Sequence, residues 1–161
     1  MEIEIYKNFV RSYGYMEGID RSKSRQDSTQ EYFTPFEFVN EVLDRVEFAK
    51  ENIFTKKSNK LLDNAAGDGQ FLTEIVIRKM ERSNCTLEQA LSTTYGVEFM
   101  EDNVKLCKQR LAGLNPTQEI WDILDKNIVH ADALTYHYRF DGTPSTTNDE
   151  ELKLNEFFSF K

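Results

Sequence analysis

One stretch of this sequence limits the fold more than any other. Residues 61–72 read LLDNAAGDGQFL: a short apolar run ends at Asp63, small residues follow, and the chain then becomes apolar again. Gly67 and Gly69 can adopt positive φ where the chain turns sharply, and residues with small side chains allow a bound molecule to approach the backbone. The stretch therefore predicts a strand, a turn that cradles a ligand, and the start of a helix.

Helical patterns lie on both sides of this turn. A helix is predicted to begin at Thr34 as its N-cap, with Pro35 in the first position, where a missing N–H costs nothing. Its buried face is expected to hold apolar residues three and four positions apart: Phe36, Val39, Val42, Leu43 and Val46. Further helices are predicted from Gln70, from a cap at Thr86, and up to a stop at Gly113.

Two more strands complete the pattern. TTYGVEF is rich in β-branched and aromatic residues and contains Glu98, and NIVHADAL, residues 127–134, forms the other strand. The order helix, strand, helix, strand, helix, strand implies right-handed βαβ crossovers. We therefore expect an α/β fold, a truncated doubly wound (Rossmann-like) parallel sheet with helices on both sides.

This sheet defines the middle of three segments. Residues 31–140 form the ligand-binding α/β domain, residues 1–30 a polar N-terminal segment, and residues 141–161 an acidic C-terminal segment. Within the first segment, RSKSRQDSTQ at 21–30 is predicted to be poor in helix. Because an uncovered sheet edge invites pairing, ELKLNEFFSF at 151–160 is expected to cover that edge or to mediate a homodimer.

Three acidic residues lie where the predicted strands end. They are Asp63, Glu98 and Asp132. Ligands of parallel sheets bind beyond the carboxyl ends of the strands, so these acids are expected to converge on one rim. A carboxylate accepts hydrogen bonds from both hydroxyls of a ribose, and Glu98 is placed for that role. The rim therefore predicts a ligand that contains a nucleoside.

The turn after Asp63 indicates which class of nucleoside-containing ligand fits the site. It lacks the third glycine of the dinucleotide-binding pattern, and Glu98 follows at more than the usual interval of about twenty residues, which disfavours a nicotinamide cofactor. Asp63 and Asp68 would repel a pyrophosphate and attract a ligand that carries an amino group and a sulfonium. S-adenosylmethionine is such a ligand.

These motifs resemble those of the S-adenosylmethionine-dependent adenine-N6 DNA methyltransferases of restriction-modification systems and phages. The family's cofactor turn, D-P-A-C-G-x-G-x-F-L, is matched here by DNAAGDGQFL, its F-T-P element by YFTP, and its later acids by YGVE and ADAL. The resemblance covers about residues 32–134, with Asn64 and Ala66 in place of the usual proline and cysteine. It implies a methyltransferase fold in which YFTP touches the methionine moiety, Glu98 holds the ribose and Asp132 faces the adenine amino group.

The resemblance implies a set of cofactor-binding residues and no metal ligand. This set is Tyr32, Phe33, Thr34, Pro35, Asp63, Ala65, Gly67, Gly69, Phe71, Glu98, Phe99, Asp132 and Ala133. The family's catalytic signature, Asn or Asp followed by Pro-Pro and an aromatic residue, hydrogen-bonds a flipped adenine and stacks on it. No Pro-Pro pair occurs in this sequence, and NEFF keeps only Asn155 and Phe158 as weak catalytic candidates.

Composition and charge limit the function further. The net charge of −8 argues against a free-standing nucleic-acid binder, so DNA contact is expected only through a second subunit or a missing domain. Cys85, Cys107, His130 and His137 form no recognisable metal-ligand pattern. No apolar run is long enough to cross a bilayer and the acidic start lacks a signal-peptide pattern, so we expect a cytoplasmic protein without a membrane partner.

Three functions remain open at this point. The chain is the cofactor half of a DNA adenine-N6 methyltransferase, split or incomplete and unable to methylate DNA alone. Alternatively, it is a non-catalytic S-adenosylmethionine-binding module that regulates or assists a partner. A third function, degradation of S-adenosylmethionine, has no sequence feature that speaks for it directly.

Overall fold

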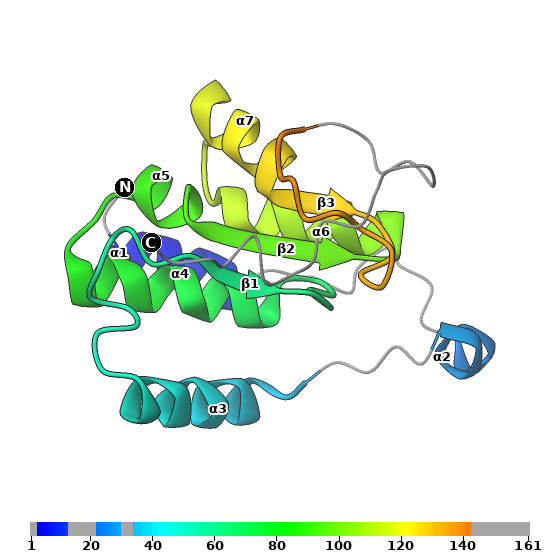
Figure 1. The fold of residues 1–161 in the computed structure, drawn as a ribbon, viewed down its shortest axis with the longest axis horizontal. Coiled ribbons are helices and arrows are strands. Elements are labelled where there is room, and N and C mark those ends of the chain that lie inside the picture. The colour runs from blue at the N-terminus through cyan, green and yellow to red at the C-terminus, as the bar shows by residue number, and fades with distance from the viewer. Residues whose placement is uncertain (1–2, 13–21, 30–33, 143–161) are drawn as a thin grey trace.

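The computed structural model describes residues 3–12, 22–29 and 34–142, which form helices around one small sheet (Figure 1). The strands are β1 (Leu61–Asp63), β2 (Thr94–Glu98) and β3 (Ile128–His130). The helices are α1 (Ile3–Ser12), α2 (Lys23–Thr29), α3 (Phe36–Ala49), α4 (Gln70–Ser83), α5 (Leu87–Leu91), α6 (Glu101–Ala112) and α7 (Gln118–Asn127). None of the helices in these ranges is both long and apolar enough to cross a membrane. Tyr32, Phe33, Asn155, Phe158 and the stretch 151–160 lie outside the described residues.

The sheet has three parallel strands in the order β1-β2-β3. Leu61 pairs with Thr94, and Gly96 pairs with Ile128, so all three strands end at the same edge. The prediction of an α/β fold with a parallel sheet is confirmed.

The expectation of helices on both faces of the sheet is wrong for the described part of the chain. Helices α4, α5, α6 and α7 all contact strands, and their apolar residues share one core. The opposite face carries Tyr95 of β2 and is covered by residues 131–140, which contribute Tyr136, Tyr138 and Phe140. The steps from β1 to β2 and from β2 to β3 run in the same direction across the sheet. Right-handed crossovers in one direction place their helices on the same side.

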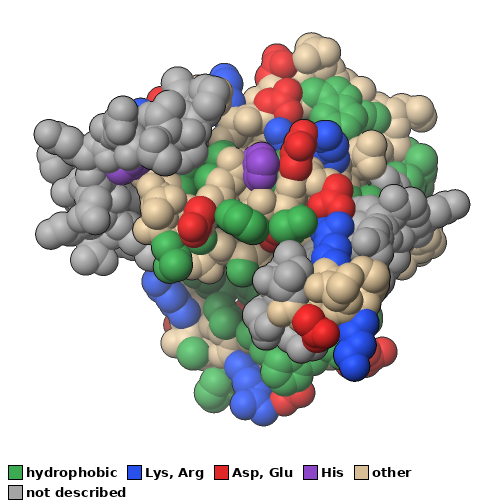
Figure 2. Space-filling model, turned by 90° about the vertical axis from the view of Figure 1, so that its right-hand side faces the viewer, with side chains coloured by type: hydrophobic (Ala, Val, Ile, Leu, Met, Phe, Trp, Pro, Cys, Tyr) green, Lys and Arg blue, Asp and Glu red, His purple; other side chains and the backbone are tan. Residues whose placement is uncertain are grey.

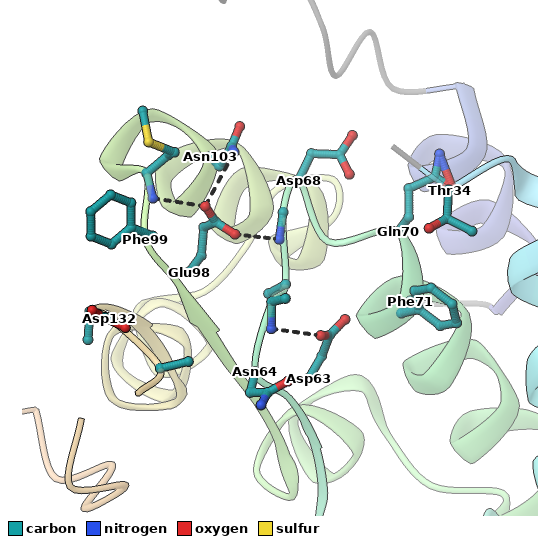
Figure 3. Close-up of a pocket in the computed structure, with 16 residues that line it drawn as sticks. Thr34, Asp63, Asn64, Asp68, Gln70, Phe71, Glu98, Phe99, Asn103 and Asp132 are labelled. Atoms are coloured by element: carbon teal, nitrogen blue, oxygen red, sulfur yellow. Dashed lines mark hydrogen bonds between the residues drawn. The ribbon is translucent and has the colours of Figure 1, made fainter. Parts of the chain in front are cut away.

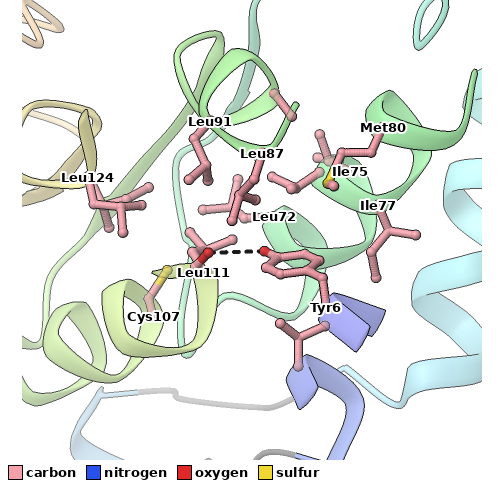
Figure 4. Packing of buried hydrophobic residues seen from close by; sticks show 14 of the residues in the cluster. Tyr6, Leu72, Ile75, Ile77, Met80, Leu87, Leu91, Cys107, Leu111 and Leu124 are labelled. Atoms are coloured by element: carbon pink, nitrogen blue, oxygen red, sulfur yellow. Dashed lines mark hydrogen bonds between the residues drawn. The ribbon is translucent and has the colours of Figure 1, made fainter. Parts of the chain in front are cut away.

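Helix α1 belongs to the core, although its residues were expected to lie in a polar N-terminal segment. Tyr6 is completely buried, and its hydroxyl donates a hydrogen bond to the carbonyl oxygen of Leu111, 3.1 Å away (Figure 4). Burial raises the pKa of this hydroxyl. Lys7 adds an ion pair with Glu81 of α4 at 2.8 Å. In IEIYKNFVRS the apolar residues recur with the period of a helix. This pattern is a local signal for α1.

Two other helices lie where the sequence predicts none. Residues 23–29 form α2, where a stretch poor in helix was predicted. Arg25 of this helix makes two hydrogen bonds to the carboxylate of Asp102 at the start of α6, a tertiary contact that the local sequence does not reveal. Helix α7 was not predicted either. Its N-cap is Thr117, whose hydroxyl accepts a hydrogen bond from the N–H of Ile120.

The predicted helix ends are partly confirmed. Thr86 and Gln89 form a reciprocal capping box at the start of α5, and Gly113 ends α6 with a positive φ. The prediction of Thr34 as an N-cap is wrong, because Pro35 occupies that position and no side chain caps α3. Of the five apolar residues expected on the buried face of α3, only Val39 and Leu43 are buried.

The glycine turn between β1 and α4 fits closely against α6. Gly67 and Gly69 both have positive φ, as predicted, with values of 54° and 88°. A Cβ atom added to Gly69 would lie 2.8 Å from the sulfur of Cys107, which is fully buried. A side chain at Gly69 would therefore strain the backbone and also displace α6.

We predict that Gly69→Ala destabilises the protein by more than Gly142→Ala does. Both glycines have positive φ, which costs about 1–2 kcal/mol for a residue with a Cβ atom. At Gly142 an added Cβ would make only an ordinary van der Waals contact, 3.7 Å from the Cγ of Lys126. The clash at Gly69 should add about 1–3 kcal/mol. Chemical denaturation of the two variants measures the difference, and equal losses of stability would contradict the close fit.

Candidate functional site

A hollow of about 450 Å³ lies at the carboxyl ends of the strands. This is the side of the molecule seen in Figure 2, where acidic and hydrophobic side chains lie together. The lining residues are Thr34, Asp63, Asn64, Ala65, Ala66, Gly67, Asp68, Gln70, Phe71, Glu98, Phe99, Met100, Asn103, Ala131, Asp132 and Ala133 (Figure 3). The hollow lies within the size range of about 300–1,000 Å³ that small-molecule sites usually have.

The carboxylate of Glu98 holds two neighbouring loops in place (Figure 3). Its Oε2 atom accepts a hydrogen bond from the N–H of Gly67 at 2.8 Å. Its Oε1 atom accepts one from the N–H of Met100 at 2.8 Å and another from the side chain of Asn103 at 3.4 Å. A carboxylate has about four acceptor positions, so the turn and the start of α6 do not use all of them. Glu98 can therefore bind a ligand that donates hydrogen bonds while it fixes the site.

Asp63 lies at the end of β1 and has a raised pKa. The main cause is burial, and the charge of Glu98 raises the pKa further. The N–H of Ala65 donates a hydrogen bond to Asp63 Oδ1 at 3.0 Å, which opposes the shift. The negative charge of a carboxylate in this position is unfavourable on its own and becomes favourable when a cation binds beside it.

Asp68 does not act as a free negative charge. The expectation that its charge would repel a pyrophosphate is therefore wrong. It is buried, and its Oδ1 atom lies 3.4 Å from Nη1 of Arg110, which also donates a hydrogen bond to the Asp68 carbonyl oxygen. Asp63, Glu98 and Asp132 therefore dominate the electrostatics. No lysine, arginine or histidine lines this hollow in the described ranges.

The structure places the predicted residues at two ends of the hollow. Thr34 and Phe71 lie at one end, and Phe99 and Asp132 lie at the other (Figure 3). The other predicted residues that line the hollow are Asp63, Ala65, Gly67, Glu98 and Ala133. Two predicted residues, Pro35 and Gly69, are not among those that line the hollow.

Several lining residues were absent from the predicted set. Asn64, Ala66, Asp68 and Gln70 belong to the glycine turn, so the motif itself was the signal for them. The other three are Met100, Asn103 and Ala131. Asn103 faces the hollow from the first turn of α6, and nothing in its sequence position distinguishes it from any other polar residue of a helix.

Comparison with known proteins gives no relative: no family model, curated protein or solved structure matches this chain. Metal binding finds no support in the described residues, where no group of three or more His, Cys, Asp or Glu side chains could hold an ion.

We predict that Asp63→Asn stabilises the empty protein at neutral pH. A pKa raised in the folded state means that folding favours the protonated acid, so stability falls as the pH rises through that pKa. Asparagine removes this effect and keeps the oxygen that accepts the Ala65 N–H. We therefore expect Asp63→Asn to unfold at a higher Tm than the wild type.

Asp132→Asn provides the matched control, because Asp132 is exposed and should change Tm much less. The difference between Asp63→Asn and the wild type should disappear at a pH below the ordinary pKa of aspartate, where both side chains are neutral. Differential scanning calorimetry over this pH range makes the measurement. A lower Tm for Asp63→Asn at neutral pH would show that the buried charge is not unfavourable.

Proposed function

We propose that the hollow binds S-adenosylmethionine and that the chain is the cofactor-binding part of an adenine-N6 DNA methyltransferase with a Rossmann-like fold. The observation that carries this proposal is the convergence of Asp63, Glu98 and Asp132 on one rim, next to a turn with two positive-φ glycines. The four motifs from YFTP to ADAL add the resemblance to the family. In this arrangement the remaining acceptor position of Glu98 binds a ribose hydroxyl, and Asp132 lies at the adenine end.

The charge of the hollow supports a cationic ligand. S-adenosylmethionine carries a sulfonium and an ammonium group, and Asp63 offers a carboxylate whose negative charge is unfavourable until a cation approaches. A phosphate-bearing nucleotide has the opposite requirement. The absence of basic residues around the hollow in the described part of the chain makes such a nucleotide the poorer fit.

A non-catalytic binding module is the second candidate. Its support is the sequence, because the residues that would orient a target adenine are missing or, as Asn155 and Phe158, lack their prolines. The net charge of −8 also opposes close approach of DNA phosphates. The two candidates share the same cofactor site and differ in whether a methyl group is transferred.

Replacing Glu98 should weaken binding through the ribose. Glu98→Gln keeps the shape of the side chain but turns one acceptor oxygen into a donor, and Glu98→Ala removes both oxygens. We expect a loss of about 1–3 kcal/mol, or roughly ten- to a hundredfold in affinity, by isothermal titration calorimetry. No heat from the folded wild type with S-adenosylmethionine or S-adenosylhomocysteine would end the proposal.

The ligand supplies the control for this experiment, since Glu98 also holds the loops around the hollow. S-adenosylhomocysteine without the ribose 2′-hydroxyl should bind the wild type more weakly than the complete ligand. The two ligands should bind Glu98→Gln almost equally, because the hydroxyl and the carboxylate act as one pair. Additive losses would place the ribose elsewhere.

We predict that the chain alone binds the cofactor and does not methylate DNA. The amino nitrogen of adenine is a weak nucleophile until acceptors align it with the sulfonium, and this alignment supplies much of the rate. Incubation with labelled S-adenosylmethionine and duplex or single-stranded DNA should leave the DNA unlabelled. Labelling that is abolished by Asn155→Ala and retained by Asn148→Ala would show that NEFF is a working catalytic site. Labelling only after a second protein is added would support a split enzyme.

A further inference from the structure

The chain just before α3 lines the hollow, and the first residue of this helix is partly exposed. Thr34 lines the hollow, and Phe36, two residues later, begins the helix with 40% of its surface exposed. A second hollow of about 290 Å³ lies between α1, Phe36 and the first turns of α4. Val39 anchors the first turn of α3 in the core, but Phe36 is not packed on a filled core, so the position of its ring depends on the side chains around this second hollow.

Arg11 of α1 is the side chain that joins these elements. Its Nε and Nη2 atoms donate hydrogen bonds to both carboxylate oxygens of Glu74, at 3.1 and 2.9 Å. Glu74 belongs to α4 and is buried. This two-point contact fixes the plane of the guanidinium, whose carbon lies 5.2 Å from the centroid of the Phe36 ring. A guanidinium at this distance from an aromatic face attracts it.

We infer that Arg11 is a positioning residue, which holds Phe36 and thereby keeps Thr34 against the amino-acid end of the bound ligand. The inference rests on the proposed function, because the resemblance of YFTP places that end of S-adenosylmethionine at Thr34. Arg11 lines the second hollow and not the first. Its effect on binding should therefore depend on whether the ligand has an amino-acid end.

Two ligands separate this role from general stability. S-adenosylmethionine carries the amino-acid group on a charged sulfonium, whereas 5′-methylthioadenosine has the adenosine on a neutral thioether sulfur and no amino-acid group, so each variant is compared with the wild type separately for each ligand. We expect Phe36→Leu to weaken binding of S-adenosylmethionine about two- to fivefold, the range of an exposed cation–π contact, and to leave 5′-methylthioadenosine unchanged. Arg11→Lys, which keeps the charge beside Glu74 but loses the planar fork, should do the same. Phe36→Tyr keeps the ring and should bind like the wild type.

Phe48→Leu is the matched control. It is the same substitution on the same helix, at a side chain that is 92% exposed and lines neither hollow. It should change neither affinity, and thermal unfolding of each variant shows that it is folded.

The calorimetry tests the inference about Arg11 and the proposed function separately. Selective loss of S-adenosylmethionine binding in Phe36→Leu and Arg11→Lys supports the inference. Equal loss for both ligands, or no loss for either, overturns it and leaves the proposed function intact. A folded wild type that binds neither ligand overturns the proposed function, and the inference falls with it.

Discussion

The site depends on one carboxylate at the end of the central strand. Glu98 accepts hydrogen bonds from Gly67 in the turn after β1 and from Met100 before α6, and its backbone carbonyl accepts one from Ala131 after β3 at 3.0 Å. A single residue thus connects the loops that follow all three strands. A buried carboxylate needs such donors to offset the loss of water. The N–H groups that donate hydrogen bonds to Glu98 therefore also give the hollow its shape. A ligand that hydrogen-bonds to Glu98 meets a site that is already formed.

One buried and one half-buried ion pair extend this arrangement away from the sheet. Arg110 pairs with Asp68 and ties the glycine turn to α6, and Arg11 pairs with Glu74 and ties α1 to α4. Buried ion pairs contribute little net stability compared with apolar side chains, because desolvation offsets much of their attraction, but removal of one partner leaves an uncompensated charge. These pairs consequently define where the elements lie more than they raise the free energy of unfolding. The glycine turn keeps its place through Arg110 and Glu98 together.

The sequence predicted the parts of the fold that depend on local pattern. The three strands and helices α3 to α6 follow from apolar spacing and turn residues, and the acids at the strand ends follow from the rule that parallel strands end at one edge. The contacts that depend on distant residues could not be predicted. The buried partner of Asp68 is Arg110, which lies 42 positions away, and the cover of the second sheet face comes from the chain after β3. Two helices had a local signal that was missed: the helical period of α1, and the Thr117 N-cap and helical period of α7.

The two walls of the hollow differ in how they are held. The wall that contains Gly67 and Glu98 is fixed by short hydrogen bonds between the ends of neighbouring strands, whereas Asp132 and Ala133 belong to the segment that crosses the second face of the sheet. In that segment Tyr138 and Phe140 adopt φ of 53° and 51°, a conformation that is costly for bulky residues. The cost is offset by ring packing, with the Phe140 centroid 4.7 Å from that of Tyr95, and by the Tyr138 hydroxyl, which donates to the Ala133 carbonyl oxygen at 2.7 Å. The aromatic cluster therefore positions the wall at Ala133 from behind, so that changes in these rings should act on the Asp132 end of the hollow before they reach Glu98.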